Sequence, residues 1–252
     1  MGKFYITGDT HGDFRHLSFY QARYNLFTED DVLIILGDSG FNYYVDENPK
    51  WKESPLNHRK YIPTTRSQRM KRDFLANCPA TIFCIHGNHE ARAETVEGYT
   101  TKQWNGSPVY YEPEFPRLLF AKDGSLYHFN GHSYLIIGGA YSVDKANRLL
   151  GFGNWFEDEQ PSEEIKARTE KLLEENHWKV HGVLSHTCPF HYEPRELFLS
   201  GINQESVDAS TEKWLDTIEQ KLDYSIWYFG HFHGNKKIDK MVMLFNDIEE
   251  LK

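Results

Sequence analysis

Cysteine, basic charge and long apolar runs are all scarce in this sequence of 252 residues. Its three cysteines, Cys78, Cys84 and Cys188, are an odd number without regular spacing, which argues against a disulfide scaffold. The longest purely aliphatic run, residues 32–36, is far shorter than the roughly 20 residues that a membrane-spanning helix needs. The first residues lack the apolar stretch and cleavage site of a secretory signal. We therefore expect a cytoplasmic protein without a membrane span.

Acidic residues outnumber basic ones, with 37 Asp and Glu against 28 Lys and Arg, and the net charge is −9. A protein that coats nucleic acid or a membrane surface needs a basic face, so this balance argues against both classes. A locally cationic pocket is still compatible with it. The 17 Phe, 15 Tyr and 6 Trp residues predict a packed core and not a disordered chain. The length is typical of one large α/β domain, and we expect a single domain over residues 1–252.

Short β-branched or aromatic runs recur along the chain, and several are followed at once by polar residues. Runs of four or five apolar residues bounded by turn residues are typical of buried strands. Between them, amphipathic segments predict helices at 14–24, at 161–178 with Ser162 as N-cap, and at 210–222. Residues 127–140 and 237–245 have the pattern of hairpins. This alternation predicts an α/β fold with mixed sheets.

Residues 41–70 interrupt the alternation with an aromatic, polar and proline-containing segment. Long irregular insertions that follow a strand end are often functional covers. We therefore expect a cap-like insertion at about 41–70 within the single domain.

Histidine is the unusual component of the sequence, with 13 residues. Polar blocks follow or end five expected strands: Asp9-x-His11, Gly37-Asp38, Gly87-Asn88-His89-Glu90, His186 and Gly230-His231-x-His233. Each block alone is an ordinary turn or cap, but ligands of open α/β sheets bind beyond the carboxyl ends of strands. Together the blocks supply carboxylate, imidazole and amide donors without a thiolate, which suits manganese, iron, zinc or nickel. The sequence therefore predicts a divalent-metal site.

The five blocks, in this order, resemble the signature of the calcineurin-like metallophosphoesterases. Trp104-Asn105-Gly106, the segment 138–145 and Trp155 are similar to a small subgroup from bacteria and phages. The resemblance implies a four-layer α-β-β-α sandwich of two mixed sheets. It also implies two bound divalent ions, with manganese favoured, held by Asp9, His11, Asp38, Asn88, His186, His231 and His233.

The family assigns these residues separate tasks. By resemblance, the first ion is held by Asp9, His11 and His233, and the second by Asn88, His186 and His231. Asp38 bridges both ions, and His89 is the catalytic residue that faces the substrate. Two divalent ions, two carboxylates and a bridging hydroxide leave a net charge of about +1, which attracts a phosphate. The implied reaction is hydrolysis of a phosphate ester by attack of the metal-bridging hydroxide, and we predict a phosphomonoesterase.

The second block departs from that of the Ser/Thr phosphatases of this superfamily, which carry Gly-Asp-x-Val-Asp-Arg-Gly there. Residues 37–43 lack both the second Asp and the Arg, so we do not expect a phosphoprotein phosphatase of that type. Other cations would have to bind the phosphate. The candidate phosphate contacts are Arg92, Lys145, Arg148 and Arg117, and the candidate pocket residues are Asn42 and Tyr43.

Two other functions stay open. One is a phosphodiesterase or nuclease that acts on a small nucleotide or on single-stranded nucleic acid; the acidic balance disfavours it, although residues 61–72 are basic and aromatic. The other is a non-catalytic scaffold that binds a protein partner, which the presence of His89 and of every ligand position disfavours. We expect a small phosphate ester as the partner, and the sequence does not specify an oligomeric state.

Overall fold

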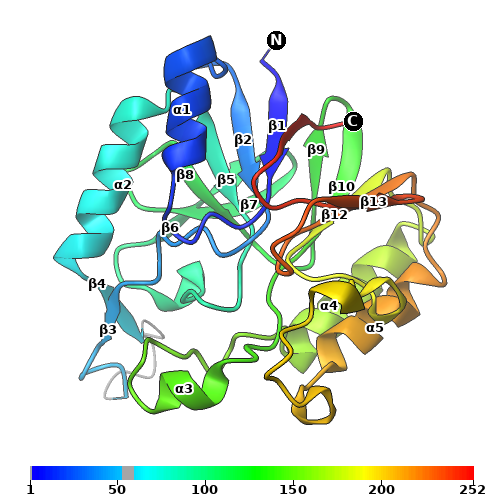
Figure 1. Cartoon of the computed structure of the whole chain (residues 1–252). Coiled ribbons are helices and arrows are strands. Elements are labelled where there is room, and N and C mark those ends of the chain that lie inside the picture. Colours follow the sequence, from blue (N-terminus) through cyan, green and yellow to red (C-terminus); the bar gives the residue numbers. More distant parts are fainter. Residues whose placement is uncertain (1, 53–59) are drawn as a thin grey trace.

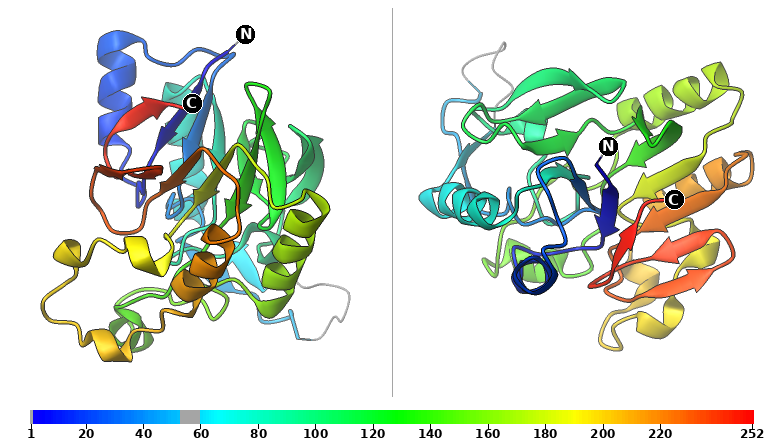
Figure 2. Two further views of the ribbon diagram at one scale, coloured as in Figure 1. Left: turned by 90° about the vertical axis from the view of Figure 1, so that its right-hand side faces the viewer. Right: turned by 90° about the horizontal axis from the view of Figure 1, so that it is seen from above.

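The computed structural model describes residues 2–52 and 60–252, so part of the expected insertion, residues 53–59, lies outside the described residues. Two large sheets lie face to face between two pairs of helices (Figures 1 and 2). One sheet is covered by α1 (Arg15–Tyr24) and α2 (Thr65–Asn77), and the other by α4 (Glu163–Glu175) and α5 (Ser210–Glu219). This confirms the expected four-layer α-β-β-α sandwich.

The first sheet has seven strands, and its central part is parallel. The strands are β1 (Phe4–Thr7), β2 (Val32–Ile35), β5 (Thr81–Cys84), β6 (Thr100–Trp104), β7 (Ser107–Tyr111), β8 (Leu118–Ala121) and β15 (Ile248–Glu250). Their order is β15-β1-β2-β5-β8-β7-β6, with β1, β2, β5 and β8 parallel and the outer pairs antiparallel. The carboxyl ends of β1, β2 and β5 therefore meet at one edge of the sheet.

The second sheet has six strands and is mixed in the same way. The strands are β9 (Ser125–Phe129), β10 (His132–Ile137), β11 (Gly182–Ser185), β12 (Ile226–Phe229), β13 (Lys236–Ile238) and β14 (Met241–Met243). Their order is β13-β14-β12-β11-β10-β9, and β10, β11, β12 and β14 are parallel. The hairpins β9–β10 and β13–β14 confirm the two that the sequence predicts.

Three apolar layers hold the sandwich together. Aromatic side chains such as Phe83, Tyr127 and Tyr228 fill the space between the sheets and are fully buried. A second cluster lies between the first sheet and α1 and α2, and a third between the second sheet and α4 and α5. Burial of an apolar side chain of this size contributes about 1.5–3 kcal/mol. These three layers therefore stabilise the sheets whose strand ends carry the site.

The helices at 14–24, 161–178 and 210–222 form at the expected places, as α1, α4 and α5. Ser162 caps α4 as expected, because its side chain accepts a hydrogen bond from the backbone N–H of Ile165. No helix in the described part of the chain combines the length and the apolar character needed to cross a bilayer.

The expected insertion at 41–70 is less irregular than the sequence suggests. It contains the antiparallel pair β3 (Val45–Glu47) and β4 (Tyr61–Pro63), and α2 begins within it at Thr65. The prediction missed α2 because its surface is mostly polar and it buries few apolar side chains, among them Phe74. The remaining short elements are α3 (Lys145–Leu149) and single turns at Ala93–Thr95, Phe190–Tyr192, Arg195–Leu197 and Gln204–Ser206.

Candidate metal centre

The loops after β1, β2, β5, β11 and β12 carry the predicted ligands and come together at one end of the two sheets. A hydrogen bond of 2.8 Å joins Nδ1 of His186, at the end of β11, to the backbone carbonyl of Leu36, after β2. The two sheets are thereby tied to each other at the site. Residues from distant parts of the sequence, such as Asp9 and His231, are brought into direct hydrogen-bond contact.

The backbone at the site adopts an unusual conformation. His11, Asp38, His231 and His233 have φ values of 48°, 44°, 66° and 54°, in the left-handed region. A residue with a side chain in this region costs about 1–2 kcal/mol. Such strain persists only where the surroundings hold it, and it often marks functional sites. Four of the seven predicted ligands therefore have a backbone conformation that the surrounding structure must hold in place.

The first ligand cluster consists of Asp9, His11 and His233. Nε2 of His11 lies 2.7 Å from Nε2 of His233, and Oδ2 of Asp9 lies 3.8 Å and 3.6 Å from these two atoms. The hydroxyl of Tyr43 contacts Nδ1 on the other side of the His11 ring. In the tautomer in which Nδ1–H of His11 donates a hydrogen bond to the Tyr43 hydroxyl oxygen, the Nε2 lone pair of His11 points into the cluster.

The second ligand cluster contains Asn88 and His186, with the ring of His231 centred 5.0 Å from that of His186. Nε2 of His186 lies 2.7 Å from Oδ1 of Asn88, whose amide nitrogen donates to Oγ of Ser142 at 2.9 Å. Because Nδ1 of neutral His186 donates to Leu36, its Nε2 carries a lone pair that faces the amide oxygen. Two acceptors at this distance fit a shared cation.

Asp9 and Asp38 lie between the two clusters and are almost completely buried. Oδ2 of Asp38 lies 4.0 Å from Nδ1 of His11 and 3.8 Å from Nε2 of His186, and its Oδ1 accepts the backbone N–H of His89 at 2.9 Å. Burial and the charges of Asp9 and Glu90 raise the pKa of Asp38 well above its usual value. Burial disfavours ionisation of Asp9 too, but His186, His233 and His11 lower its pKa to about 2.

This donor set fits divalent metal ions. Two adjacent buried carboxylates need a compensating positive charge, and neutral imidazoles cannot supply it. The ligand atoms of Asp9, His11 and His233 lie within 4.8 Å of one another, and so do those of Asp9, Asp38 and His186. Oxygen and nitrogen donors of this kind suit zinc, iron, nickel and manganese.

His89 lies at the rim of both clusters. Its ring centre is 5.9 Å from that of His11 and 6.4 Å from that of Tyr43. Burial lowers the pKa of His89 to about 2, and the charges of Arg148 and His11 contribute to the shift. The backbone bond from His89 to Asp38 fixes the position of this residue relative to the predicted bridging ligand.

Glu90 is a functional residue that the sequence reasoning quoted but did not assign. Its carboxylate is buried and accepts hydrogen bonds from the backbone N–H groups of Ser39, Gly40 and Gly87 and from the hydroxyl of Ser39, at 2.7–3.4 Å. It thus fastens the loop that carries Asp38 to its own loop, which carries Asn88 and His89. The motif placed a carboxylate there, but only the adjacency of β2 and β5 shows what it binds.

The four candidate phosphate contacts lie in different environments. Arg148, on α3, bonds to Asp144 and to the carbonyl of Asn154, and its charge lowers the pKa values of His89 and His11, so it lies near the site. The ammonium group of Lys145 lies 4.2 Å from the centre of a Trp155 ring. Arg92 and Arg117 instead bind other parts of the fold.

Arg92 is buried, pairs with Asp123 at 2.5 Å and donates to the carbonyl of Asp158. Arg117 donates to four backbone carbonyls near the end of α2. Both guanidinium groups are therefore engaged in holding the fold, and their placement does not favour the phosphate contact expected for them. Asn42 is buried and accepts from the Tyr99 hydroxyl at 2.7 Å, whereas Tyr43 reaches the site directly.

The comparison with known proteins agrees with this geometry. Residues 2–235 match the family model described as calcineurin-like phosphoesterase. No curated protein sequence matches the chain. Among solved structures, a phosphopantetheinyl hydrolase from Mycobacterium tuberculosis is similar, with 14% identity and a TM-score of 0.44 over 97% of this chain and 88% of that chain. Because the family match spans most of the sequence, the chain belongs to the calcineurin-like phosphoesterase family and is a metal-dependent phosphoesterase.

Proposed function

We propose that the protein is a phosphomonoesterase with a dinuclear metal centre, with manganese favoured, and that its substrate is a small phosphate ester. The observation that carries the proposal is the placement of Asp38. Its Oδ2 lies 3.8 Å from Nε2 of His186 and 4.0 Å from Nδ1 of His11, so one buried carboxylate lies beside a histidine of each ligand cluster. Two neighbouring ions that share a carboxylate are the arrangement that hydrolytic two-metal sites use.

Each cluster would hold one ion. Asp9, His11 and His233 would hold the first ion, and Asn88, His186 and His231 the second. Asp38, which groups with Asp9 and His186, would bridge them. When bound, the ions would supply the activation of water at neutral pH and the neutralisation of the phosphate charge. Two of these imidazoles are oriented by hydrogen bonds of their Nδ1 atoms. His11 bonds to the Tyr43 hydroxyl, and His186 bonds to the backbone carbonyl of Leu36.

The remaining residues act on the substrate. His89, held by its backbone bond to Asp38, would face the leaving oxygen of the ester. Its pKa is low in the free protein, and the negative charge of a bound phosphate would raise it, so that His89 could protonate the leaving group. Arg148 adds a positive charge beside His89 and His11, which favours an anionic substrate. Lys145, on the same helix, would approach the phosphate from the Trp155 side. A monoester carries one more negative charge than a diester. Arg148 shares its charge with Asp144, so Lys145 is the cation that would favour the monoester most.

The segment around α3 and the start of the expected insertion would together form a cover. The side-chain amide of Asn154 donates to the carbonyls of Tyr43 and Val45, at 3.0 Å and 3.2 Å. The two segments therefore meet beside the residues that contact His11 and His89. We place the enzyme in the cytoplasm, a compartment that suits its three free, buried cysteines.

The test compares p-nitrophenyl phosphate with bis-p-nitrophenyl phosphate as substrates of the Mn²⁺-loaded protein. We expect kcat/KM to be at least about tenfold higher for the monoester, because the second charge binds only there. His89→Ala should lower kcat by about 10²–10⁴-fold and keep the bound metal. Asp38→Ala should lose metal as well as activity.

His128→Ala is the matched control, because His128 is an exposed histidine of β9 outside both clusters. The activity of this variant should equal that of the wild type. A protein that hydrolyses the diester faster would be a phosphodiesterase. A metal-loaded His89→Ala enzyme with wild-type kcat would contradict the role of His89.

A further inference from the structure

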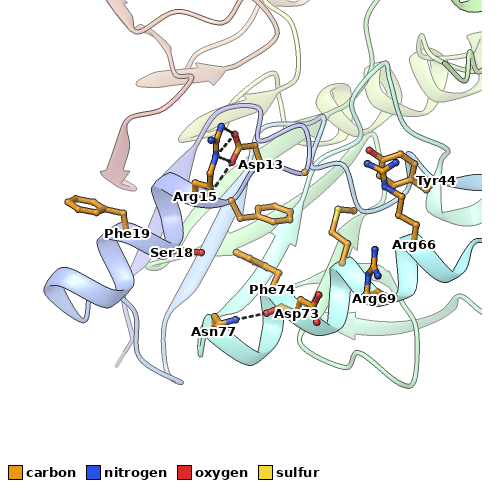
Figure 3. A pocket seen from close by; sticks show the side chains of 13 residues that line it. Asp13, Arg15, Ser18, Phe19, Tyr44, Arg66, Arg69, Asp73, Phe74 and Asn77 are labelled. Carbon is orange, nitrogen blue, oxygen red and sulfur yellow. Dashed lines mark hydrogen bonds and ion pairs between the residues drawn. The ribbon is translucent and has the colours of Figure 1, made fainter. Parts of the chain in front are cut away.

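A groove of about 680 Å³ lies between α1 and α2, and the reaction described above does not use it. Its walls come from the loop after β1, from both helices and from Tyr44 (Figure 3). The groove differs in chemistry from the metal centre, because no histidine lines it.

The groove begins at the metal centre. Gly12, which lines it, directly follows the predicted ligand His11, and a Cβ atom at Gly12 would lie 3.1 Å from Sδ of Met70 on α2. Tyr44, which also lines the groove, directly follows Tyr43, whose hydroxyl contacts His11. The groove thus comes within one residue of His11 and of Tyr43, and the part of an ester beyond its scissile phosphate would extend from the metal centre toward it.

The floor of the groove is apolar and aromatic. Phe14, Met70 and Phe74 line it, and the rings of Phe14 and Phe74 lie 4.2 Å apart at their centres. Phe19, on α1, is 57% exposed at the far end (Figure 3). Phe74 is 5% exposed and packs against Phe14, so the surface open to a planar ligand comes from Phe14 and Met70, which are partly exposed. Stacking of a nucleobase on an exposed aromatic side chain is worth about 1–3 kcal/mol.

The rim carries cationic side chains without an acidic partner. The guanidinium carbon of Arg66 lies 3.7 Å from the ring centre of Tyr44, which holds the group in place and leaves its N–H donors free. Within the described residues, neither Arg66 nor Arg69 has an ion-pair partner, whereas Arg15 is paired with Asp13. The remaining acidic side chain on the rim is Asp73, so the groove keeps an excess of positive charge.

We propose that this groove binds the nucleoside part of a nucleotide substrate that carries a second phosphate. The base would lie on the apolar floor, and the second phosphate would bind Arg66 and Arg69 while the first lies at the metal centre. A free pair of arginines next to an apolar floor is unusual in a protein of net charge −9, and a second phosphate complements both features. The inference rests on the proposed function, because it names the substrate class of that site.

The test uses three substrates: p-nitrophenyl phosphate, adenosine 5′-monophosphate and adenosine 3′,5′-bisphosphate. The wild-type enzyme should have the highest kcat/KM for the bisphosphate. The double variant Arg66→Gln/Arg69→Gln should lower this value by about tenfold to a hundredfold, mainly through KM, because two charge-assisted hydrogen-bond partners are lost. Its kcat/KM for p-nitrophenyl phosphate should change less than twofold, since that substrate has no second phosphate.

Two further variants separate the groove from general effects of charge and folding. Arg72→Gln removes a cation from the same helix, but Arg72 pairs with Glu114 and does not line the groove, so all three activities should be unchanged. Ser18→Trp fills the groove from the exposed face of α1 and should abolish the preference for both nucleotides while leaving hydrolysis of p-nitrophenyl phosphate intact.

Three results would overturn the inference. The wild type could show no preference for the bisphosphate over the monophosphate, the double variant could lose hydrolysis of p-nitrophenyl phosphate as strongly as that of the bisphosphate, or Ser18→Trp could keep the full preference for the bisphosphate. Failure of the proposed function looks different, because the wild-type protein would then be inert on p-nitrophenyl phosphate as well.

Discussion

Replacing Glu90 gives a sharp test of how the site is built, because this buried carboxylate holds two ligand loops together. Glu90→Ala removes the acceptor of four hydrogen bonds, three of them from backbone N–H groups in the loops that carry Asp38 and Asn88. Glu90→Gln keeps one oxygen but turns an NH₂ group toward the same donors. The first variant should therefore be affected more strongly than the second.

The expected magnitude follows from the contacts. A buried donor that loses its partner costs about 1–3 kcal/mol, but the bonds of 3.2–3.4 Å from Ser39, Gly40 and Gly87 are long. We therefore expect Glu90→Ala to lower the free energy of unfolding by about 3–5 kcal/mol, and Glu90→Gln by about 1–3 kcal/mol. Because the loops position Asp38 and Asn88, metal affinity should fall by about 10–100-fold in Glu90→Ala.

Guanidinium chloride unfolding and a Mn²⁺ titration measure the two effects. Glu114→Gln is the matched control. Glu114 is an exposed acid, and within the described residues its ion-pair partner is Arg72. Its free energy of unfolding should change by less than about 0.5 kcal/mol. A Glu90→Ala protein with wild-type stability and wild-type metal affinity would refute the role of Glu90.

Three other substitutions test separate parts of the structure. Burial raises the pKa of Glu212 to about 7, so the folded state binds its proton more tightly than the unfolded state does. The free energy of unfolding of the wild-type protein should therefore fall by about 3 kcal/mol as the pH rises from 4.5 to 7. Glu212→Gln should remove this fall in urea unfolding at pH 5 and 8, and a wild-type free energy that does not change with pH would contradict the prediction. Tyr43→Phe should weaken Mn²⁺ binding by about 10–100-fold in a metal titration, and unchanged affinity would exclude that role. Lys71→Met removes the ion-pair partner of buried Glu112 and should lower the free energy of unfolding by about 3–5 kcal/mol in chemical unfolding. Lys71→Met/Glu112→Leu should recover most of this loss, and a Lys71→Met protein of wild-type stability would contradict the burial of the pair.

Much of the fold was predictable because the signals are local. Buried strands such as β2 and β11 are short apolar runs bounded by turn residues, and Ser162 marks the start of α4 by its capping side chain. The helix α2 was missed because it buries the charged side chain of Lys71 along with Phe74, which breaks the apolar periodicity. Lys71 is tolerated there because it pairs with Glu112, 41 residues away in the sequence.

The candidate site divides in the same way. The predicted ligands follow strand ends directly, so the order of the blocks along the sequence was enough to propose them, and the structure brings them together. The partners of the arginines could not be predicted, because they depend on contacts across the fold. Arg92 meets Asp123 from a different strand end, whereas Arg148 approaches His89 from α3.

We propose that the two clusters hold two metal ions and that the metal-loaded protein hydrolyses a phosphate ester. The most direct measurement strips the protein with a chelator and then follows hydrolysis of p-nitrophenyl phosphate while Mn²⁺ is added back, with the bound metal counted by elemental analysis. We expect no activity in the stripped protein and a rise in activity that ends when two ions are bound per chain. Full activity without metal, or two bound ions without any hydrolysis of either ester, would contradict it.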